Sequence, residues 1–375
     1  MKLAGVRVLD LSQYLPGPHL TMTMADHGAD VIMVEGPGGE PTRNMGVRDK
    51  DGSSVWFRNI ARGKRSATLD LKSDAGRKTF FALADEADVI VESFRPGVVK
   101  RLGIDYETVA ARNMAIVYCS LSAFGQSGPL RDKPAHDLAV QALAGTADLS
   151  RGLRDASPAM PNLVAADMAA SLTALSAILM ALFARAKTGK GDYIDVAMYD
   201  SLLAWTPNIS GSVLAHDEAP VPQGMRNYGG QAMNCIYETK DGGHIALAGN
   251  EPKFCENLLL ALNRPDFIAL AKAEPGPRQK PLIDFFISLF KTKTRAEWEA
   301  ILSALDLCWA PLRSLKDGFT DAHTAARAML LTDAKGKRHI GPAIKFAGEP
   351  AKPVLEAPPQ GTANAPEWRR QPADK

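Results

Sequence analysis

The chain has 375 residues, of which 46% are hydrophobic, so it can bury a large core and is long enough for two domains. Its net charge of +2 comes from 44 basic and 42 acidic side chains mixed along the chain, which leaves no electrostatic footprint for nucleic acid or an anionic membrane. Its four cysteines have neither CxxC nor CxxH spacing, so we expect reduced thiols and no disulfide framework or zinc site.

The first two hundred residues alternate strand and helix patterns. The segment "MKLAGVRVLDLS" leads directly into a strand and has no secretory leader pattern, so we expect a cytoplasmic protein. Strands are predicted over 6–12, 29–35, 66–71, 88–93 and 114–124, with helices over 18–28 and 74–87. Such alternation predicts a parallel sheet with helices on both faces, connected by right-handed βαβ units.

The segment "MAASLTALSAILMALFA" over 168–184 is uncharged and has a helical composition. It is shorter than the ~20 apolar residues that span a bilayer, and it contains several Ser and Thr. Asp167 and Arg185 bracket it. We therefore predict a helix buried on most sides of a protein that has no membrane partner.

The amino-acid composition changes in the second half of the chain. Pro, Gly, Asn and Gln become frequent around 205–230, which predicts a linker over 206–224 between a large domain over 1–205 and a small α+β domain over 225–320. In the small domain, two alternating runs flank "DGG" at 241–243, a hairpin pattern. Thr294 and Glu297 have the spacing of a capping box. The segment 321–375 is expected to return to the large domain.

Several well-known motifs are missing. The turn after the first strand, "LDLSQYLPGPH", has no GxGxxG, so the sheet is not predicted to bind a dinucleotide. The chain also has no P-loop, no GxSxG elbow and no HExxH. These absences argue against a dehydrogenase, a kinase and an unaided hydrolase.

Two residues next to helix starts are unusual. Asp167 lies among apolar or small neighbours, where burial of a carboxylate costs several kcal/mol unless it is hydrogen-bonded or protonated. A first-turn acid facing its own helix dipole is the structural alternative. His136 precedes Asp137 at the start of the apolar run "LAVQALAG". A helix cap accounts for Asp137, and a core histidine is the structural alternative for His136.

Four further polar residues could bind a ligand. Arg95 follows a strand and precedes a helix, the usual position of a ligand-binding residue in an open α/β sheet, and its guanidinium could bind a phosphate. Arg62 and Lys64 form a second cationic cluster beside a glycine, and Glu251 also follows a strand. A solvated loop charge for Arg95 and a first-turn acid for Glu251 are the structural alternatives.

The motifs taken together resemble one family. The ordered segments "LDLSQYLPGPHLTMTMADHGADVIMVE", "RGKRSATLDLK", "ADVIVESFRPGVVKRLG", "IVYCSLSAFGQSGP", "HDLAVQALAG" and "ARAKTGKGDYIDVAMYDS" resemble the family III CoA-transferase superfamily, which includes the α-methylacyl-CoA racemases. The resemblance runs from residue 3 to about 320. It implies a Rossmann-like large domain, a smaller α+β domain and an interlaced homodimer. It also implies an acyl-CoA substrate and no metal or redox cofactor.

The resemblance also assigns site residues. Arg95 matches the arginine of the family's "RPG" segment near the CoA phosphates, and we expect Gly97, Arg62, Lys64 and Asp137 to complete the CoA site. Asp167 matches the catalytic aspartate that transferases and racemases share.

The position of His136 distinguishes the two branches of the family. Transferases usually have an aromatic residue there, and their aspartate attacks the thioester to form an anhydride. Racemases have "GHD" and "xEPxF", which "AHD" and "NEPKF" of this chain resemble, so His136, Asp167 and Glu251 match the racemase set. Inversion at the carbon α to a thioester needs a base on one face and an acid on the other.

In this hypothesis Glu251 orients His136, and the helix N-terminus beside Asp167 stabilises the enolate. "MAAS" after Asp167 and Val140 depart from the racemase pattern. A CoA transferase that uses Asp167 as its nucleophile therefore stays open, as does a CoA-binding protein without catalysis.

Overall fold

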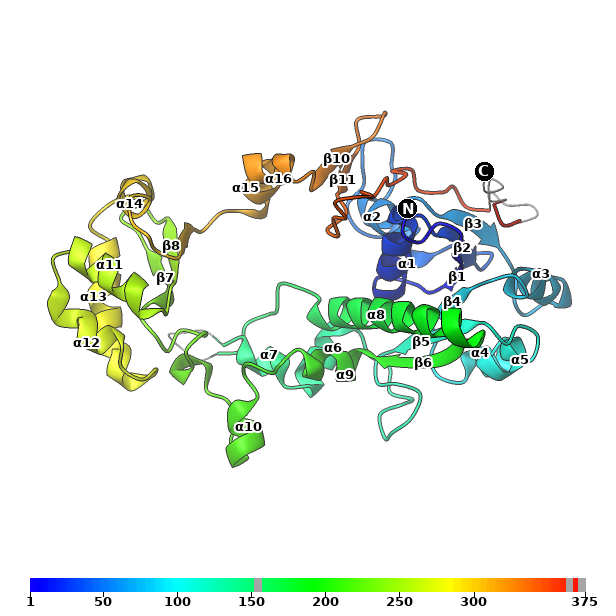
Figure 1. The fold of residues 1–375 in the computed structure, drawn as a ribbon, viewed down its shortest axis with the longest axis horizontal. Coiled ribbons are helices and arrows are strands. Elements are labelled where there is room, and N and C mark those ends of the chain that lie inside the picture. The colour runs from blue at the N-terminus through cyan, green and yellow to red at the C-terminus, as the bar shows by residue number, and fades with distance from the viewer. Residues whose placement is uncertain (152–156, 362–366, 370–375) are drawn as a thin grey trace. The chain divides into compact units, whose positions relative to one another are not determined.

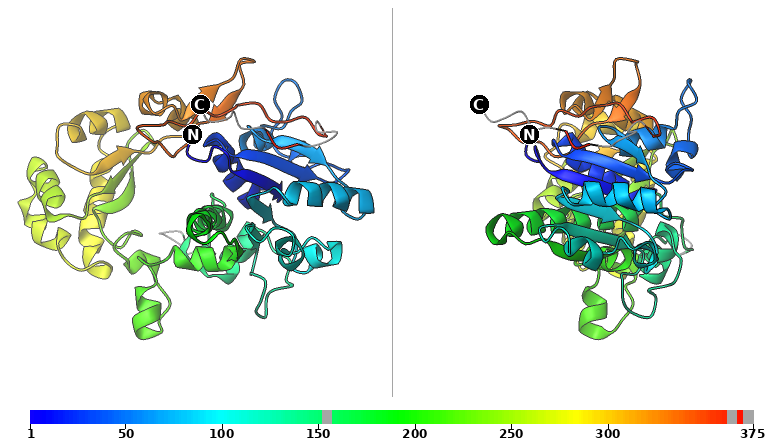
Figure 2. Two further views of the ribbon diagram at one scale, coloured as in Figure 1. Left: turned by 45° about the vertical axis from the view of Figure 1, so that its right-hand side comes forward. Right: turned by 90° about the vertical axis from the view of Figure 1, so that its right-hand side faces the viewer.

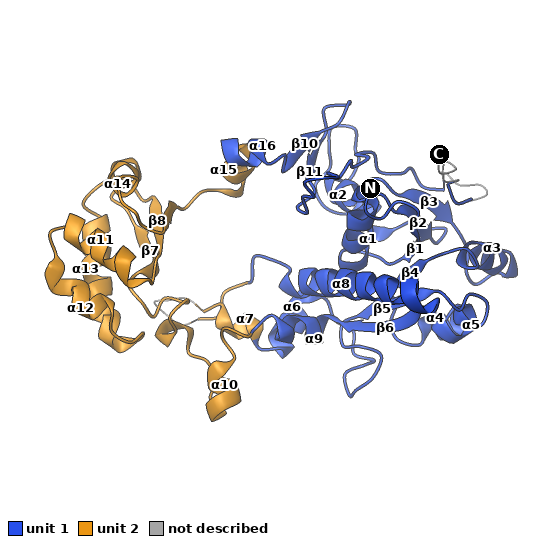
Figure 3. Ribbon diagram, in the orientation of Figure 1, with its two compact units in different colours: residues 1–145, 161–206, 322–375 blue, residues 146–160, 207–321 orange. Residues whose placement is uncertain are grey.

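The computed structural model describes residues 1–151, 157–361 and 367–369. These residues belong to two compact units, which are described separately below (Figure 3). Unit 1 comprises 1–145, 161–206 and 322–375, and unit 2 comprises 146–160 and 207–321. The predicted domains divided the chain at 205/206 and 320/321, and they placed 146–160 in the large domain.

A six-stranded parallel sheet forms the centre of unit 1 (Figure 1). The strands run in the order β3-β2-β1-β4-β5-β6, so the strand order reverses between β1 and β4, where open α/β sheets bind their ligands. Their bounds are β1 Arg7–Leu11, β2 Asp30–Glu35, β3 Arg65–Thr68, β4 Val89–Glu92, β5 Val117–Ser122 and β6 Asp192–Ala197. The predicted α/β class with a parallel sheet is confirmed.

Helices cover both faces of this sheet (Figure 2). The row Val8, Val31, Val89 and Val117 packs on α1 and α8, because these side chains share one face. The next row, Leu9, Ile32, Ile90 and Tyr118, packs on α3 and α5 on the other face. The helices of unit 1 are α1 Pro16–Asp26, α2 Val55–Ala61, α3 Asp74–Ala84, α4 Val98–Leu102, α5 Tyr106–Ala110, α6 Asp137–Leu143, α8 Ala165–Thr188, α9 Met198–Ala204 and α16 Ala322–Ala326.

The helix α8 is longer and less buried than predicted. Ala166, Ala170 and Ala174 lie in the core, because small residues spaced by four let the helix approach the sheet closely. Met180 and Phe183 on its other side are 70% and 67% exposed. The helix has 24 residues and is long and apolar enough to cross a membrane. Core helices of soluble proteins can have the same length and composition, so α8 alone does not indicate a membrane protein.

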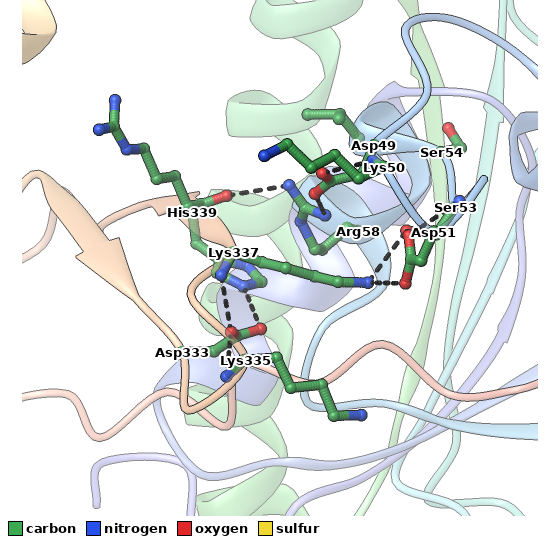
Figure 4. Close-up of polar contacts among 12 residues, drawn as sticks. Asp49, Lys50, Asp51, Ser53, Ser54, Arg58, Asp333, Lys335, Lys337 and His339 are labelled. Atoms are coloured by element: carbon green, nitrogen blue, oxygen red, sulfur yellow. Dashed lines mark hydrogen bonds and ion pairs between the residues drawn. The ribbon is translucent and has the colours of Figure 1, made fainter.

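The C-terminal segment is held against the first half of unit 1. The hairpin of β10 (Leu330–Thr332) and β11 (Arg338–Ile340) lies beside the loop that precedes α2 (Figure 4). Lys337 forms an ion pair with Asp51, and the Nη2 of Arg58 donates to the Arg338 carbonyl at 3.3 Å. Further along, Trp368 inserts into the core beneath α3 and donates to the Leu83 carbonyl at 3.2 Å.

Unit 2 combines a three-stranded antiparallel sheet with helices. Its strands run in the order β7-β8-β9, with bounds Asn234–Glu238, His244–Ala248 and Trp309–Pro311. The predicted hairpin around 241–243 is confirmed by the β7–β8 pairing, and both hydrogen bonds of the Thr294–Glu297 capping box are present. The helices of unit 2 are α7 Thr146–Leu149, α10 Gly211–His216, α11 Pro252–Ala261, α12 Ile268–Ala271, α13 Lys280–Phe290, α14 Arg295–Leu302 and α15 Leu315–Thr320.

Candidate active site

A cavity of about 910 Å³ lies within unit 1 at the carboxyl ends of β1, β4 and β5. It therefore adjoins the point where the strand order reverses. Connecting loops, α6 and the first turn of α8 contribute most of its wall. The lining residues include Gln13, Tyr14, Ser93, Arg95, Arg131, Lys133, His136, Asp167 and Met198.

His136 stands directly before α6, and its imidazole lines the cavity. It is the N-cap residue with extended backbone angles, but its side chain makes no capping hydrogen bond. The side chain is exposed, so the core histidine considered from the sequence is excluded. The ring contacts Tyr14 edge to face, with ring centroids 5.7 Å apart and planes at 77°. An imidazole in this position can exchange protons with a ligand in the cavity.

Asp137 is buried and holds the start of α8. Its Oδ1 accepts hydrogen bonds from the backbone N–H groups of Ala166 at 2.8 Å and Asp167 at 3.2 Å, and its Oδ2 accepts one from Gln141 at 2.6 Å. The carboxylate thus caps a helix that begins 28 residues later in the chain. Asp137 does not line the cavity, so its position does not support the predicted contact with CoA.

This arrangement also corrects the predicted source of enolate stabilisation. The sequence suggested that the N-terminus of the helix at Asp167 would face a developing negative charge. The N–H groups of residues 166 and 167 instead donate to Asp137, and that of Met168 donates to the Val164 carbonyl. These three donors are therefore not free to bind an enolate oxygen.

Asp167 lies in the first turn of α8, and its carboxyl group lines the same cavity as His136. Burial, and to a smaller extent the negative charge of Asp137, raise the pKa of Asp167 to about 7. In the part of the chain that the structure describes, no side chain donates a hydrogen bond to this carboxylate. A carboxyl group with this pKa can both give and take a proton near neutral pH.

Arg95 supplies an uncommitted cation at the cavity. Its guanidinium is exposed and forms no hydrogen bond or ion pair with the described residues. Gly97 adopts a left-handed φ of 83°, and a Cβ there would lie 3.6 Å from the guanidinium nitrogens of both Arg101 and Arg131. Lys133 adds a further positive charge to the lining. Phosphate groups would find several charge-assisted donors at this edge.

A buried acid supports the loop that carries Arg95. Glu92 ends β4 and accepts a hydrogen bond from the backbone N–H of Phe94 at 2.8 Å. Burial raises the pKa of Glu92 to about 7. Glu92 was not predicted as a functional residue, because in the sequence it is one residue of an apolar strand over 88–93.

Arg62 and Lys64 have internal partners. The Arg62 guanidinium forms two hydrogen bonds with Asp26, at 3.0 and 2.6 Å, and the side chains are 1% and 2% exposed. Lys64 donates to Asp10 and to the Pro18 carbonyl, each at 2.8 Å, and is fully buried. The predicted contact of these two cations with CoA is therefore not supported, because both charges are already neutralised away from solvent.

Glu251 belongs to unit 2. It precedes α11 and lines a second cavity of about 230 Å³, together with Arg226, Asn227, Asn234 and Asn250. The predicted role of Glu251 in orienting His136 stays a prediction, because the latter belongs to unit 1. Among residues 1–151, 157–361 and 367–369, no cluster of three His, Cys, Asp or Glu side chains could hold a metal ion.

Comparisons with known proteins identify the family of the chain. A family model described as CoA-transferase family III matches residues 3–364. A succinyl-CoA:glutarate CoA-transferase from Mus musculus is 31% identical over 92% of this chain and 80% of its own length. An alpha-methylacyl-CoA racemase from Homo sapiens is 32% identical over 96% of this chain and 90% of its own length. A crystal structure of a CAIB/BAIF family protein from Brucella suis superposes with a TM-score of 0.83 at 30% identity and covers 97% of both chains.

Proposed function

Because the chain belongs to CoA-transferase family III, whose members include racemases and CoA-transferases, it is an enzyme, and we propose that it inverts the carbon next to the thioester of an α-methylacyl-CoA. The observation that carries this proposal is that His136 and Asp167 line one cavity at the switch point of the sheet. An imidazole and a carboxyl group there supply the two proton carriers that inversion requires.

The proposed reaction moves one proton off the substrate and one onto it. Neutral His136 takes the α-proton, the electrons of the C–H bond form an enolate, and protonated Asp167 delivers a proton to the opposite face. The reverse direction uses the Asp167 carboxylate as the base and the imidazolium as the acid. The pKa of Asp167, about 7, suits both roles. This reaction proceeds with side chains alone, and CoA enters only as part of the substrate.

The cationic edge of the cavity supports an acyl-CoA substrate. CoA carries phosphate groups, and Arg95 has an exposed guanidinium without an internal partner. With Arg95 on the phosphates, the thioester would extend into the cavity toward His136.

We also propose that two copies of the chain associate. The solvent-exposed side of α8 carries Leu172, Leu179, Met180 and Phe183, all at least 40% exposed. A row of large apolar side chains on one helix favours burial against a second copy. A dimer would also offer a route for Glu251 of one copy to reach a site in its partner. Sedimentation equilibrium of the wild type and Met180→Glu tests this, and a wild-type monomer at micromolar concentration contradicts it.

Deuterium exchange tests the reaction directly. A 2-methylacyl-CoA incubated with the enzyme in D₂O should lose its α-proton signal and gain one mass unit. His136→Ala and Asp167→Asn should each slow the exchange at least about 100-fold, and His216→Ala, an exposed histidine of α10, is the matched control. Absence of exchange over a panel of branched and aryl acyl-CoAs rules the proposal out.

The second candidate function is a CoA transferase. It is favoured because CoA-transferases at 31% and 32% identity are about as similar to this chain as a racemase at 32%. Here the Asp167 carboxylate attacks the thioester carbonyl and releases CoA thiolate, which leaves a mixed anhydride on Asp167. Hydroxylamine would trap this anhydride and inactivate the enzyme at Asp167 alone, and His136→Ala would have little effect.

A further inference from the structure

Tyr14 adopts a backbone conformation that non-glycine residues avoid. Its φ is +67°, in the left-handed region. Asp217, Asn263 and Ala328 are the other described non-glycine residues with positive φ. An aromatic side chain has no local hydrogen bond that would favour this region, unlike Asp or Asn. Such strain persists only where the surrounding structure imposes it, and it concentrates at functional sites.

Two neighbouring loops impose this conformation. The backbone N–H of Tyr14 donates to Glu40 Oε1 at 2.9 Å, and that of Gln13 donates to Ser93 Oγ at 2.9 Å. Glu40 is itself buried and fixed, since it also accepts a hydrogen bond from the Thr42 N–H at 2.8 Å. The turn after β1 is thereby attached to the loops after β2 and β4.

Core packing does not explain the strain. The Tyr14 side chain remains 37% exposed and belongs to none of the hydrophobic clusters of unit 1. Its ring lines the cavity and meets the His136 ring edge to face at 5.7 Å. The contact that the strained backbone provides is therefore a contact with the proposed proton carrier.

We propose that Tyr14 is a positioning residue for His136. The aromatic ring limits rotation of the exposed imidazole, which has no capping hydrogen bond to hold it, and keeps its nitrogen directed into the cavity. This inference rests on the proposed function, because it assigns His136 the proton transfer. The hydroxyl group of Tyr14 has no part in it, so the ring alone should be sufficient.

Substitutions of Tyr14 separate the effect of its aromatic ring from the effect of its backbone conformation. Tyr14→Gly removes the ring and relieves the positive φ, so the variant should melt no lower than the wild type. Its kcat for α-proton exchange should fall at least tenfold with KM within twofold, while Tyr14→Phe stays within twofold in both. Tyr14→Asn, which also tolerates this φ, is a second variant without the ring. Asn263→Gly, at φ +54° in unit 2, controls for glycine substitution alone.

A second readout does not depend on turnover. In protein labelled with ¹³C-histidine, the seven histidines give ring signals, and His136→Gln identifies that of His136. The chemical shift of this signal should change in Tyr14→Gly and Tyr14→Asn and stay unchanged in Asn263→Gly. An unchanged His136 signal together with wild-type kcat in Tyr14→Gly overturns the inference. If the wild type shows no α-proton exchange, the proposed function fails, and the histidine signal alone then decides the role of Tyr14.

Discussion

Asp137→Asn is the substitution that best tests how the site controls Asp167. The Asp137 carboxylate accepts two N–H groups of α8 and raises the pKa of Asp167 through its charge. Asparagine keeps the shape and one acceptor oxygen but removes the charge. Burial, the larger cause of the raised pKa, remains.

The magnitude follows from the pKa of Asp167. Its rise from 3.8 to about 7 corresponds to about 4 kcal/mol at 1.36 kcal/mol for each pH unit. Taking the Asp137 charge, the smaller of the two causes, as about one pKa unit, the low end of the shifts of about 1–3 units that a nearby charge produces, Asp137→Asn should bring the pKa of Asp167 to about 6. The weaker cap should also cost about 1–2 kcal/mol of unfolding free energy.

The two candidate reactions respond differently. Inversion uses the state in which His136 and Asp167 share one proton, and its rate falls on the alkaline side as that proton is lost. In the direction in which Asp167 is the acid, lowering its pKa from about 7 to about 6 lowers its protonated fraction at pH 8, and with it the exchange rate, about tenfold. A transferase needs only the Asp167 carboxylate, so its activity would rise at pH 6 and stay unchanged at pH 8.

The assay is kcat/KM for α-proton exchange between pH 5 and 9. Asp200→Asn removes a first-turn acid of α9 that does not line the cavity, and it should leave the profile unchanged. If folded Asp137→Asn retains the wild-type alkaline limb, the charge of Asp137 does not control Asp167, and the reasoning fails.

Three further substitutions test other parts of the site. Between about pH 4 and 7, Asp167 binds more protons in the folded than in the unfolded state, so its contribution to stability is lost as pH rises through that window. Asp167→Asn should therefore stabilise the protein at pH 8 by up to about 4 kcal/mol and hardly at all at pH 4. Thermal melting at both pH values checks this, and an equal gain at both contradicts it. Arg95→Ala should raise KM for acyl-CoA about 10- to 100-fold but leave KM for a pantetheine thioester without the nucleotide unchanged. Lys100→Ala is the control, and an equal rise of KM for both substrates would place Arg95 away from the phosphates. Arg62→Ala should leave the buried Asp26 carboxylate unpaired and cost about 3–5 kcal/mol of unfolding free energy, while the folded fraction keeps its KM; a stable variant with raised KM would restore the predicted role in CoA binding.

Local patterns predicted most of the sheet. Of the five predicted strands, β1, β2, β4 and β5 follow from apolar runs, because a parallel strand buried on both faces is composed largely of apolar residues. The strand β6 was not predicted, because it lies at the sheet edge and its first four residues include two exposed aspartates. For α8, the predicted 17-residue segment stopped at charged residues that the helix passes through.

The site predictions that the structure does not support share one physical origin. Arg62 and Lys64 look like free cations in the sequence, because their acidic partners stand 36 and 54 residues away. Asp137 looks like a cap for its own helix, but the helix that it caps starts beyond residue 164. The left-handed backbone conformation of Tyr14 cannot be recognised from the sequence, because tyrosine is not a residue type that favours it. Each case depends on a long-range partner that no local pattern contains.

Buried acids fix the backbone beside three of the functional side chains. Glu92 accepts a hydrogen bond from the loop of Arg95, Glu40 from Tyr14, and Asp137 from the turn that carries Asp167. Glu92 ends β4, Glu40 lies in the loop after β2, and Asp137 begins α6. In such loops and turns few backbone groups have partners in regular secondary structure. Each carboxylate supplies the missing acceptor, and burial makes loss of that acceptor costly. Beside this cavity three buried acids therefore hold the backbone of the functional side chains, whereas one acid, Asp167, is proposed to react.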